Sequence, residues 1–160
     1  MPRFLAAALL SLFTFMAANV AVAENVATDP WAEQLAALDR IDPADGHYVV
    51  GLVVFAFMNT DQGESPDPMA ASLRQSVGFR ALAEAARRVA WPEMADALLR
   101  MVEQIERTGW VDEEGFQGVM GVMGQLEDSR LEAQLSTHGD QVERLSDALQ
   151  THIDQTVAAL

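Results

Sequence analysis

Three Asp-Pro pairs constrain the fold more than any other feature of the sequence: Asp29-Pro30, Asp42-Pro43 and Asp67-Pro68. An aspartate just before a helix accepts a hydrogen bond from a free backbone amide. Proline fits the first helical position because its missing donor would have no partner there anyway. The pairs therefore predict three helix starts, with the first helix running to about Arg40 and the second ending near Asn59.

The third predicted helix runs from Pro68 to about Val89, and Gly78 would allow a bend within it. The chain restarts at Trp91-Pro92, because the residue before a proline avoids helical dihedral angles. A fourth helix follows with apolar residues at helical spacing, and Gly109 is the expected C-cap.

A fifth helix is expected to open at Asp112, where three successive carboxylates complement the helix dipole. From there to Leu160 the apolar pattern is helical, with at most one interruption, at Gly139. No segment alternates with period two for long enough to form a sheet. The sequence therefore predicts an all-α fold: a single-domain bundle of five or six helices with a long, heptad-patterned C-terminal helix.

The first 23 residues have the three parts of a secretory signal: the basic Arg3, an apolar run, and Ala21-Val22-Ala23 before Glu24. We expect cleavage after Ala23, which leaves an all-α domain over residues 24–160 with no stable membrane insertion. An uncleaved membrane anchor is the alternative. Alanine-rich, arginine-only composition suggests a GC-rich bacterium, so the expected location is the periplasm of a Gram-negative cell or the medium.

Charge and missing residue types exclude several classes of function. The chain has 24 acidic and 10 basic residues and a formal charge of −14, so nucleic acid is not expected as a partner. All the basic residues are arginine, and without lysine there is no Schiff-base chemistry, Ser-Lys dyad or P-loop. Cysteine is also absent, so the core must hold without disulfides.

Residues 48–58 (YVVGLVVFAFM) form the most apolar segment after the signal. Eleven residues are too few to cross a bilayer as a helix. We expect a helix that is apolar around its whole circumference, either as the central element of the bundle or as a face offered to another subunit.

A glycine repeat follows the fifth predicted helix start, at Gly115, Gly118, Gly121 and Gly124. Each glycine costs a helix roughly 0.5–1 kcal/mol relative to alanine, so some other effect must offset the loss. Close approach of a neighbouring backbone is one explanation, and a flexible or ligand-facing segment is the other. Met120 and Met123 lie within this stretch at a spacing that either fills a core or presents two thioethers to Cu(I).

The C-terminal region carries a heptad seam typical of a coiled coil, with spacings of four and three residues: Leu131, Leu135, His138, Val142, Leu145, Leu149 and His152. Both histidines belong to a Thr-His-x-Asp-Gln unit that occurs twice, fourteen residues apart. Along one continuous helix they are about 21 Å apart and cannot share an ion.

Gly139 leaves two interpretations of this region open. We expect the helix to continue through it, because the phase of the seam is unbroken; the alternative is a new helix capped by Asp140 and Glu143. In an antiparallel dimer, His138 of one chain would face His152 of the other and could hold a metal. Otherwise the two histidines only set the register of the seam.

These features predict a non-catalytic secreted protein that acts through protein–protein contact, either as a homodimer through the seam or by docking to an envelope partner. No cofactor is expected. The alternative is a periplasmic bundle that binds a transition metal or haem through His and Met ligands. Catalytic signatures such as H-E-x-x-H, G-x-S-x-G and C-x-x-C-H are absent from the sequence. An acid–base enzyme would require two carboxylates at a working separation.

Overall fold

The three Asp-Pro helix starts are confirmed in the computed structural model, which describes residues 29–60 and 67–160. Asp29, Asp42 and Asp67 each accept a hydrogen bond from the backbone amide two residues on, at 2.9 to 3.0 Å. In all three helices proline occupies the first turn. The predicted signal sequence, residues 1–23, lies outside the described residues.

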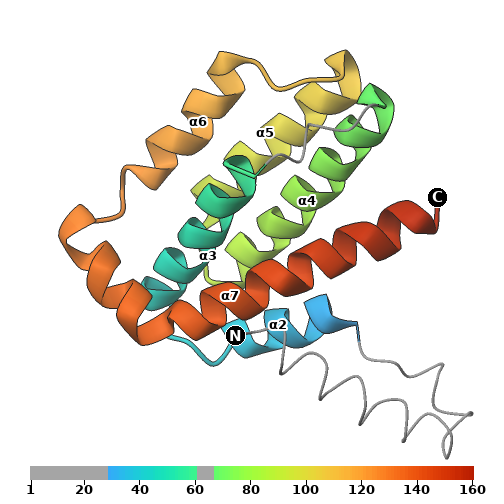
Figure 1. Ribbon diagram of the computed structural model, residues 1–160. Helices are drawn as coiled ribbons and strands as arrows, with labels where there is room; N and C mark the ends of the chain where they lie inside the picture. The colour runs from blue at the N-terminus through green and yellow to red at the C-terminus, as the bar shows by residue number, and fades with distance from the viewer. Residues whose placement is uncertain (1–28, 61–66) are drawn as a thin grey trace, which may run out of the picture.

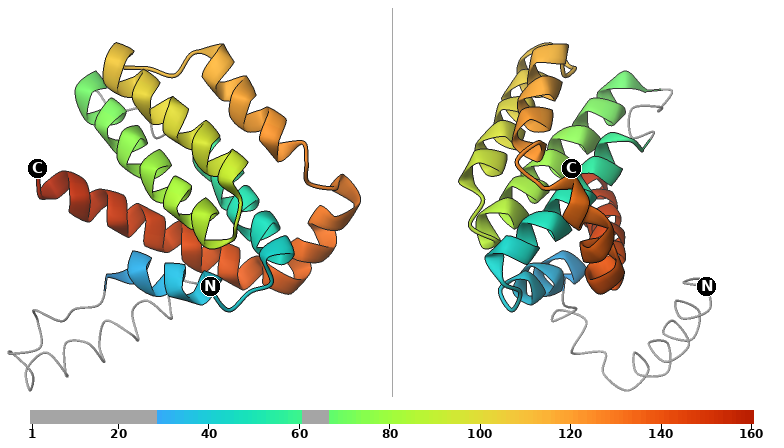
Figure 2. Two further views of the ribbon diagram at one scale, coloured as in Figure 1. Left: turned by 180° about the vertical axis from the view of Figure 1, so that it is seen from behind. Right: turned by 90° about the vertical axis from the view of Figure 1, so that its left-hand side faces the viewer.

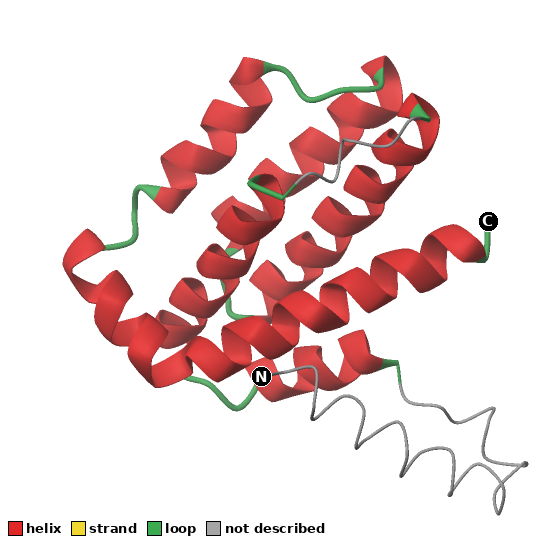
Figure 3. Cartoon of the chain, viewed as in Figure 1, coloured by secondary structure: helices red, strands yellow, loops and turns green. Residues whose placement is uncertain are grey.

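The described residues form six α-helices and no strands, so the all-α class is confirmed (Figure 3). The helices are α2 (Pro30–Leu38), α3 (Pro43–Met58), α4 (Pro68–Arg88), α5 (Pro92–Thr108), α6 (Glu113–Met123) and α7 (Asp128–Ala158). None of them is both long and apolar enough to traverse a bilayer.

Helices α3, α4 and α5 run side by side, and α7 crosses α3 and α4 (Figures 1 and 2). The short helix α2 lies along α7, which packs against α2, α3 and α4. Helix α6 lies at the outer edge and packs mainly on α5. The bundle is therefore a compact group of helices with one peripheral helix.

Helix α3 is a core element, as one of the two interpretations of its apolar sequence predicted. Eight of its residues are buried, and Val50 and Val54 are fully enclosed. Phe55 and Ala56 are exposed, and Phe55 has 48 % of its surface accessible. The apolar circumference is thus used within the chain, because α4 and α7 both pack on this helix.

The expected helical run from Asp112 to Leu160 is broken at a different place from the one predicted. Helix α7 continues through Gly139, as the seam phase indicated, but the chain leaves helical structure between Gly124 and Glu127. Two contacts to α3 fix this break: the Glu127 N–H donates to the Tyr48 hydroxyl at 3.1 Å, and Leu126 lies over Gly51. The glycine-rich helix ends early because tertiary contacts capture the chain there.

Helices α4 and α5 both end in a left-handed residue. Helix α5 ends at Gly109, with φ of 87°, as predicted. After α4 the same role falls to Ala90, with φ of 53°. The amide of Ala90 donates to the Arg87 carbonyl and that of Trp91 to the Ala86 carbonyl, which is the bonding pattern of a Schellman motif.

Candidate functional site

The predicted seam lies on α7, but the chain's own core takes up part of it. Leu145 and Leu149 are buried, whereas Leu135 is 50 % exposed. The remaining seam positions, Leu131, His138, Val142 and His152, are half-buried. Toward the C-terminus, Ala148 and Ile153 join the buried face, because a straight helix drifts away from a strict seven-residue repeat.

Each seam histidine lies beside an aspartate at the start of another helix of the same chain. His138 Nε2 is 3.6 Å from the Asp45 carboxylate, to which the Gln134 amide also donates at 2.8 Å. His152 Nδ1 is 3.9 Å from the Asp29 carboxylate. The repeated unit therefore marks the places where the first turns of α3 and α2 meet α7.

Within one copy of the chain, the described residues do not bring together a set of metal ligands. In residues 29–60 and 67–160, no three His, Cys, Asp or Glu side chains form a group that could hold a metal ion. Of the two methionines proposed for Cu(I), Met123 packs against the core. The third histidine, His47, is fixed by the Val89 carbonyl at 2.9 Å and by stacking on Trp91 at 4.7 Å.

The close-approach explanation of the glycine repeat is wrong at two of its four positions. A Cβ added at Gly118 or Gly121 would meet nothing within 4 Å. Only Val119 of α6 is fully buried. Gly115 is the glycine of this helix that lies under a neighbour, since its missing Cβ makes room for Gln104 of α5.

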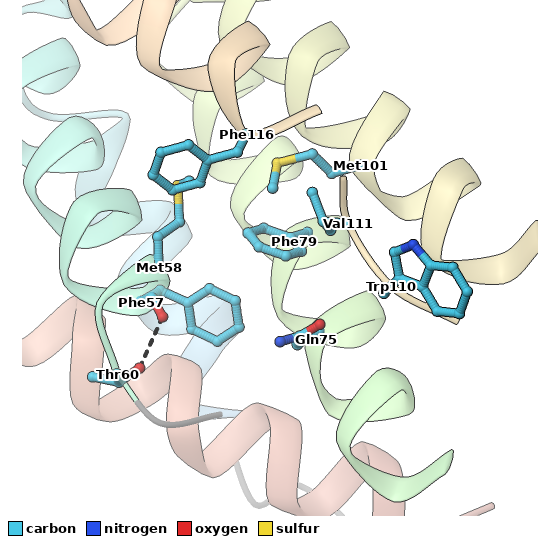
Figure 4. Close-up of a pocket in the computed structure, with 9 residues that line it drawn as sticks. All are labelled: Phe57, Met58, Thr60, Gln75, Phe79, Met101, Trp110, Val111 and Phe116. Carbon is cyan, nitrogen blue, oxygen red and sulfur yellow. Dashed lines mark hydrogen bonds between the residues drawn. The ribbon is translucent and has the colours of Figure 1, made fainter. Parts of the chain in front are cut away.

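A cavity of about 250 Å³ lies between α3, α4, α5 and the start of α6, and we call it the aromatic pocket (Figure 4). It is lined by Phe57, Met58, Thr60, Gln75, Phe79, Met101, Trp110, Val111 and Phe116. Three of these side chains, Phe57, Phe79 and Met101, are at most 4 % exposed and belong to the core. Trp110 and Phe116 are 66 % and 41 % exposed. The pocket thus joins the core to two exposed aromatic rings.

The buried side of the pocket depends on a glycine in α4. Gly78 lies directly against the Phe57 ring, so the ring occupies the space that a Cβ would need. The Phe57 ring then meets Phe79 edge to face, with centroids 5.1 Å apart and an interplanar angle of 88°. This arrangement suits the quadrupoles of the two rings and fixes their orientation.

The exposed side of the pocket is set by the turn between α5 and α6. Gln104 Oε1 accepts the Asp112 N–H at 3.0 Å, and the Asp112 carboxylate accepts the Gly115 N–H at 2.9 Å. The Gly115 hydrogen bond is the main reason that the pKa of Asp112 is lowered from its ordinary value of 3.8. These bonds fix the start of α6. They thereby fix the positions of Trp110 and Phe116, which precede and follow Asp112 in the sequence.

Two further cavities differ from the aromatic pocket in size and chemistry. One, of about 420 Å³, lies between α5 and the opposite side of α6, where Arg100 and Arg107 face Glu103, Asp112 and Glu114. Two arginines and three carboxylates thus line a cavity of mixed charge. The other, of about 140 Å³, is a small hollow between α3 and α7.

Sequence reasoning gave residues 48–58 either to the core or to an interface, and it did not identify the pocket at their C-terminal end. The available signal was Trp110, a large apolar residue between the C-cap Gly109 and the N-cap Asp112. A tryptophan in a short connection between helices has few neighbours of its own to cover it. Phe116 gave a second signal, in the first turn of a helix with few other large residues.

The chain matches no family model, and comparison with curated proteins and with solved structures yields no significant match. Its function must therefore be argued from the geometry of the pocket.

Proposed function

We propose that this is a non-catalytic exported protein that acts through protein–protein contact, and that the aromatic pocket is its contact site. One observation carries the proposal: Trp110 and Phe116 are exposed beside a cavity whose inner side is made of core residues. Binding energy at protein interfaces concentrates in a few apolar or aromatic anchors that fill such pockets.

The volume of the pocket favours a side chain over a free cofactor. Small-molecule sites usually measure roughly 300–1,000 Å³, and the aromatic pocket is smaller, at about 250 Å³. A cavity of about 150 Å³ is sufficient for benzene. The pocket therefore suits one ring or one branched side chain presented by a partner, and haem would be too large for it.

The seam on α7 is a poorer candidate for the contact site than the aromatic pocket. Leu145 and Leu149 serve the chain's own core, so a dimer built on the full seam would have to take them out of it. Leu135 and the half-buried Leu131 remain on the outside of α7. Neither residue lines any of the three cavities described above.

Native mass spectrometry of protein isolated from the envelope of the producing cells tests the proposal. We expect a mature chain that begins at Glu24, associated with a second polypeptide. Phe116→Ala should weaken the complex by about tenfold or more, as loss of an interface anchor does. Phe55→Ala is the matched control, because Phe55 is 48 % exposed and does not line the pocket.

Two outcomes would contradict the proposal. One is a complex that survives Phe116→Ala and is lost with Phe55→Ala, which would place the contact on α3. The other is a purified chain that carries a stoichiometric metal or haem, which would favour the alternative function. Sedimentation of the purified protein then shows whether the partner is a second copy of this chain.

A further inference from the structure

We infer that the group entering the aromatic pocket is an aromatic side chain with a polar edge, on a partner segment that carries basic residues beside it. The inference rests on the proposed function and specifies the chemistry of its partner. It follows from three properties of the described residues: the side chains that surround the cavity, one polar group without a partner, and the charge at the edge.

The lining favours a ring over an aliphatic side chain. Phe57 and Phe79 are already arranged edge to face, so a third ring can meet either one through its face or its edge. Met58 and Met101 also line the cavity, and thioether sulfurs make favourable contacts with aromatic rings. An aliphatic side chain would fill the same volume without these contacts.

The polar edge is inferred from Gln75. This half-buried side chain of α4 lies between Phe57 and Trp110 at the pocket (Figure 4). It has no hydrogen bond within the described residues, whereas Thr60 Oγ1 donates to the Phe57 carbonyl at 2.8 Å. Gln75 is thus available to a phenolic hydroxyl or an indole N–H that enters with the ring. A hydrogen bond of this kind discriminates against a ring that lacks the polar atom.

The basic flank is inferred from the charge next to the pocket. The lining residues Trp110 and Val111 lead directly into Asp112, Glu113 and Glu114, all three exposed. Because the pKa of Asp112 is lowered, its carboxylate stays ionised in mildly acid solution. Arg100 and Arg107, which share the second cavity with Asp112 and Glu114, offset two of the three charges. Glu113 and the formal charge of −14 on the whole chain leave this edge acidic. A partner with lysine or arginine next to its ring gains charge complementarity here, and an acidic partner is repelled.

Short capped peptides test the inference on the full mature chain. The probes are Lys-Tyr-Lys, Glu-Tyr-Glu, Lys-Phe-Lys and Lys-Leu-Lys, each flanked by glycine. Protection of tryptophan from acrylamide quenching reports binding at the pocket, since Trp31 and Trp91 are at most 2 % exposed and Trp110 is 66 % exposed. We expect Lys-Tyr-Lys to bind about tenfold more tightly than either Lys-Leu-Lys or Glu-Tyr-Glu.

Two further measurements separate the ring from the charge. Gln75→Leu should remove the preference for Lys-Tyr-Lys over Lys-Phe-Lys, because leucine cannot form a hydrogen bond with the phenolic hydroxyl. Raising the salt concentration to about 1 M shortens the Debye length to about 3 Å, so the preference for lysine over glutamate should disappear. Phe55→Ala should change none of these values, and thermal melting checks that each variant is folded.

The results distinguish failure of this inference from failure of the proposed function. Equal binding of the tyrosine and leucine peptides, or no binding by any peptide while the native complex still depends on Phe116, overturns the inference and leaves the proposed function standing. A native complex that Phe116→Ala does not weaken overturns both the inference and the proposed function. If free N-acetyltyrosinamide binds as tightly as Lys-Tyr-Lys, the pocket serves a small aromatic compound, which also overturns both.

Discussion

The glycines of the core and the glycines of α6 differ in what surrounds them. At Gly46, Gly51 and Gly78, an added Cβ would overlap a side chain from elsewhere in the bundle. At Gly118 and Gly121 it would meet open space. The first group lets helices come close together, whereas the second lowers the helix propensity of α6 with no compensating contact in the described residues. Identical residues should therefore respond in opposite ways to substitution by alanine.

The largest expected effect is at Gly78 in α4. In Gly78→Ala the new methyl group would overlap the Phe57 ring, and relief requires movement of a side chain that is itself buried. Overpacking of this kind costs about 1–3 kcal/mol. Urea unfolding measures the loss, and peptide binding should weaken as well, because Phe57 lines the pocket. Unchanged stability would show that this part of the core is loosely packed.

A smaller change in stability is expected from substitutions at the left-handed residues that follow α4 and α5. The change should have opposite signs at the two positions. Ala90 and Gly109 both have positive φ, a conformation that costs a residue with a Cβ about 1–2 kcal/mol. Ala90→Gly should therefore stabilise the protein and Gly109→Ala should destabilise it. Nothing lies within 4 Å of a Cβ at Gly109, so that change tests backbone strain alone. Shifts of the same sign in thermal unfolding would contradict this account.

The helix boundaries were the most predictable part of the fold because they depend on local chemistry. The Asp-Pro starts and the Gly109 C-cap are each determined within a few residues of sequence. The break before α7 was not predicted, because it depends on two contacts to the distant helix α3: the Tyr48 hydroxyl accepts the Glu127 N–H, and Leu126 lies over Gly51. Such long-range contacts leave no periodic signal.

The repeated Thr-His-x-Asp-Gln unit shows the same limit at the candidate site. Its period correctly indicated one continuous helix through Gly139. The partners of the histidines, Asp45 and Asp29, lie in other helices and could not be read from the repeat. The aromatic pocket was missed for a similar reason, since its lining comes from four helices and two of the connections between them.

Alanine in α6 should have the reverse effect of alanine in the core. Gly118→Ala and Gly121→Ala should each stabilise the free protein by roughly 0.5–1 kcal/mol, because alanine loses less backbone entropy in a helix and the added methyl groups meet no neighbour. Gly115→Ala is the control within the same helix, since its Cβ would overlap Gln104. Urea unfolding of the three variants measures the contrast. Destabilisation by Gly118→Ala would mean that α6 packs more closely than the structure shows.

The smallest expected effect concerns the cap that holds α6 in place. The folded-state pKa of Asp112 is lowered, mainly by the Gly115 amide, so its contribution to stability is present above the ordinary value of 3.8 and is lost as the pH falls through the folded-state value. Asp112→Asn keeps an oxygen acceptor for that amide at every pH. The stability difference between wild type and variant should therefore narrow as the pH is lowered below 3.8.

Thermal melting across that pH range, with Glu113→Gln as a neighbouring control for charge, measures the effect. Parallel curves for wild type and Asp112→Asn would mean that the ionised cap contributes nothing to folding. Helix α6 would then be held by Gln104 and by the packing of Val119, Val122 and Met123. If the stability difference between wild type and variant becomes smaller at low pH, then α6, which has little burial of its own, depends on its N-cap. Helix α3 differs, because packing stabilises it along most of its length.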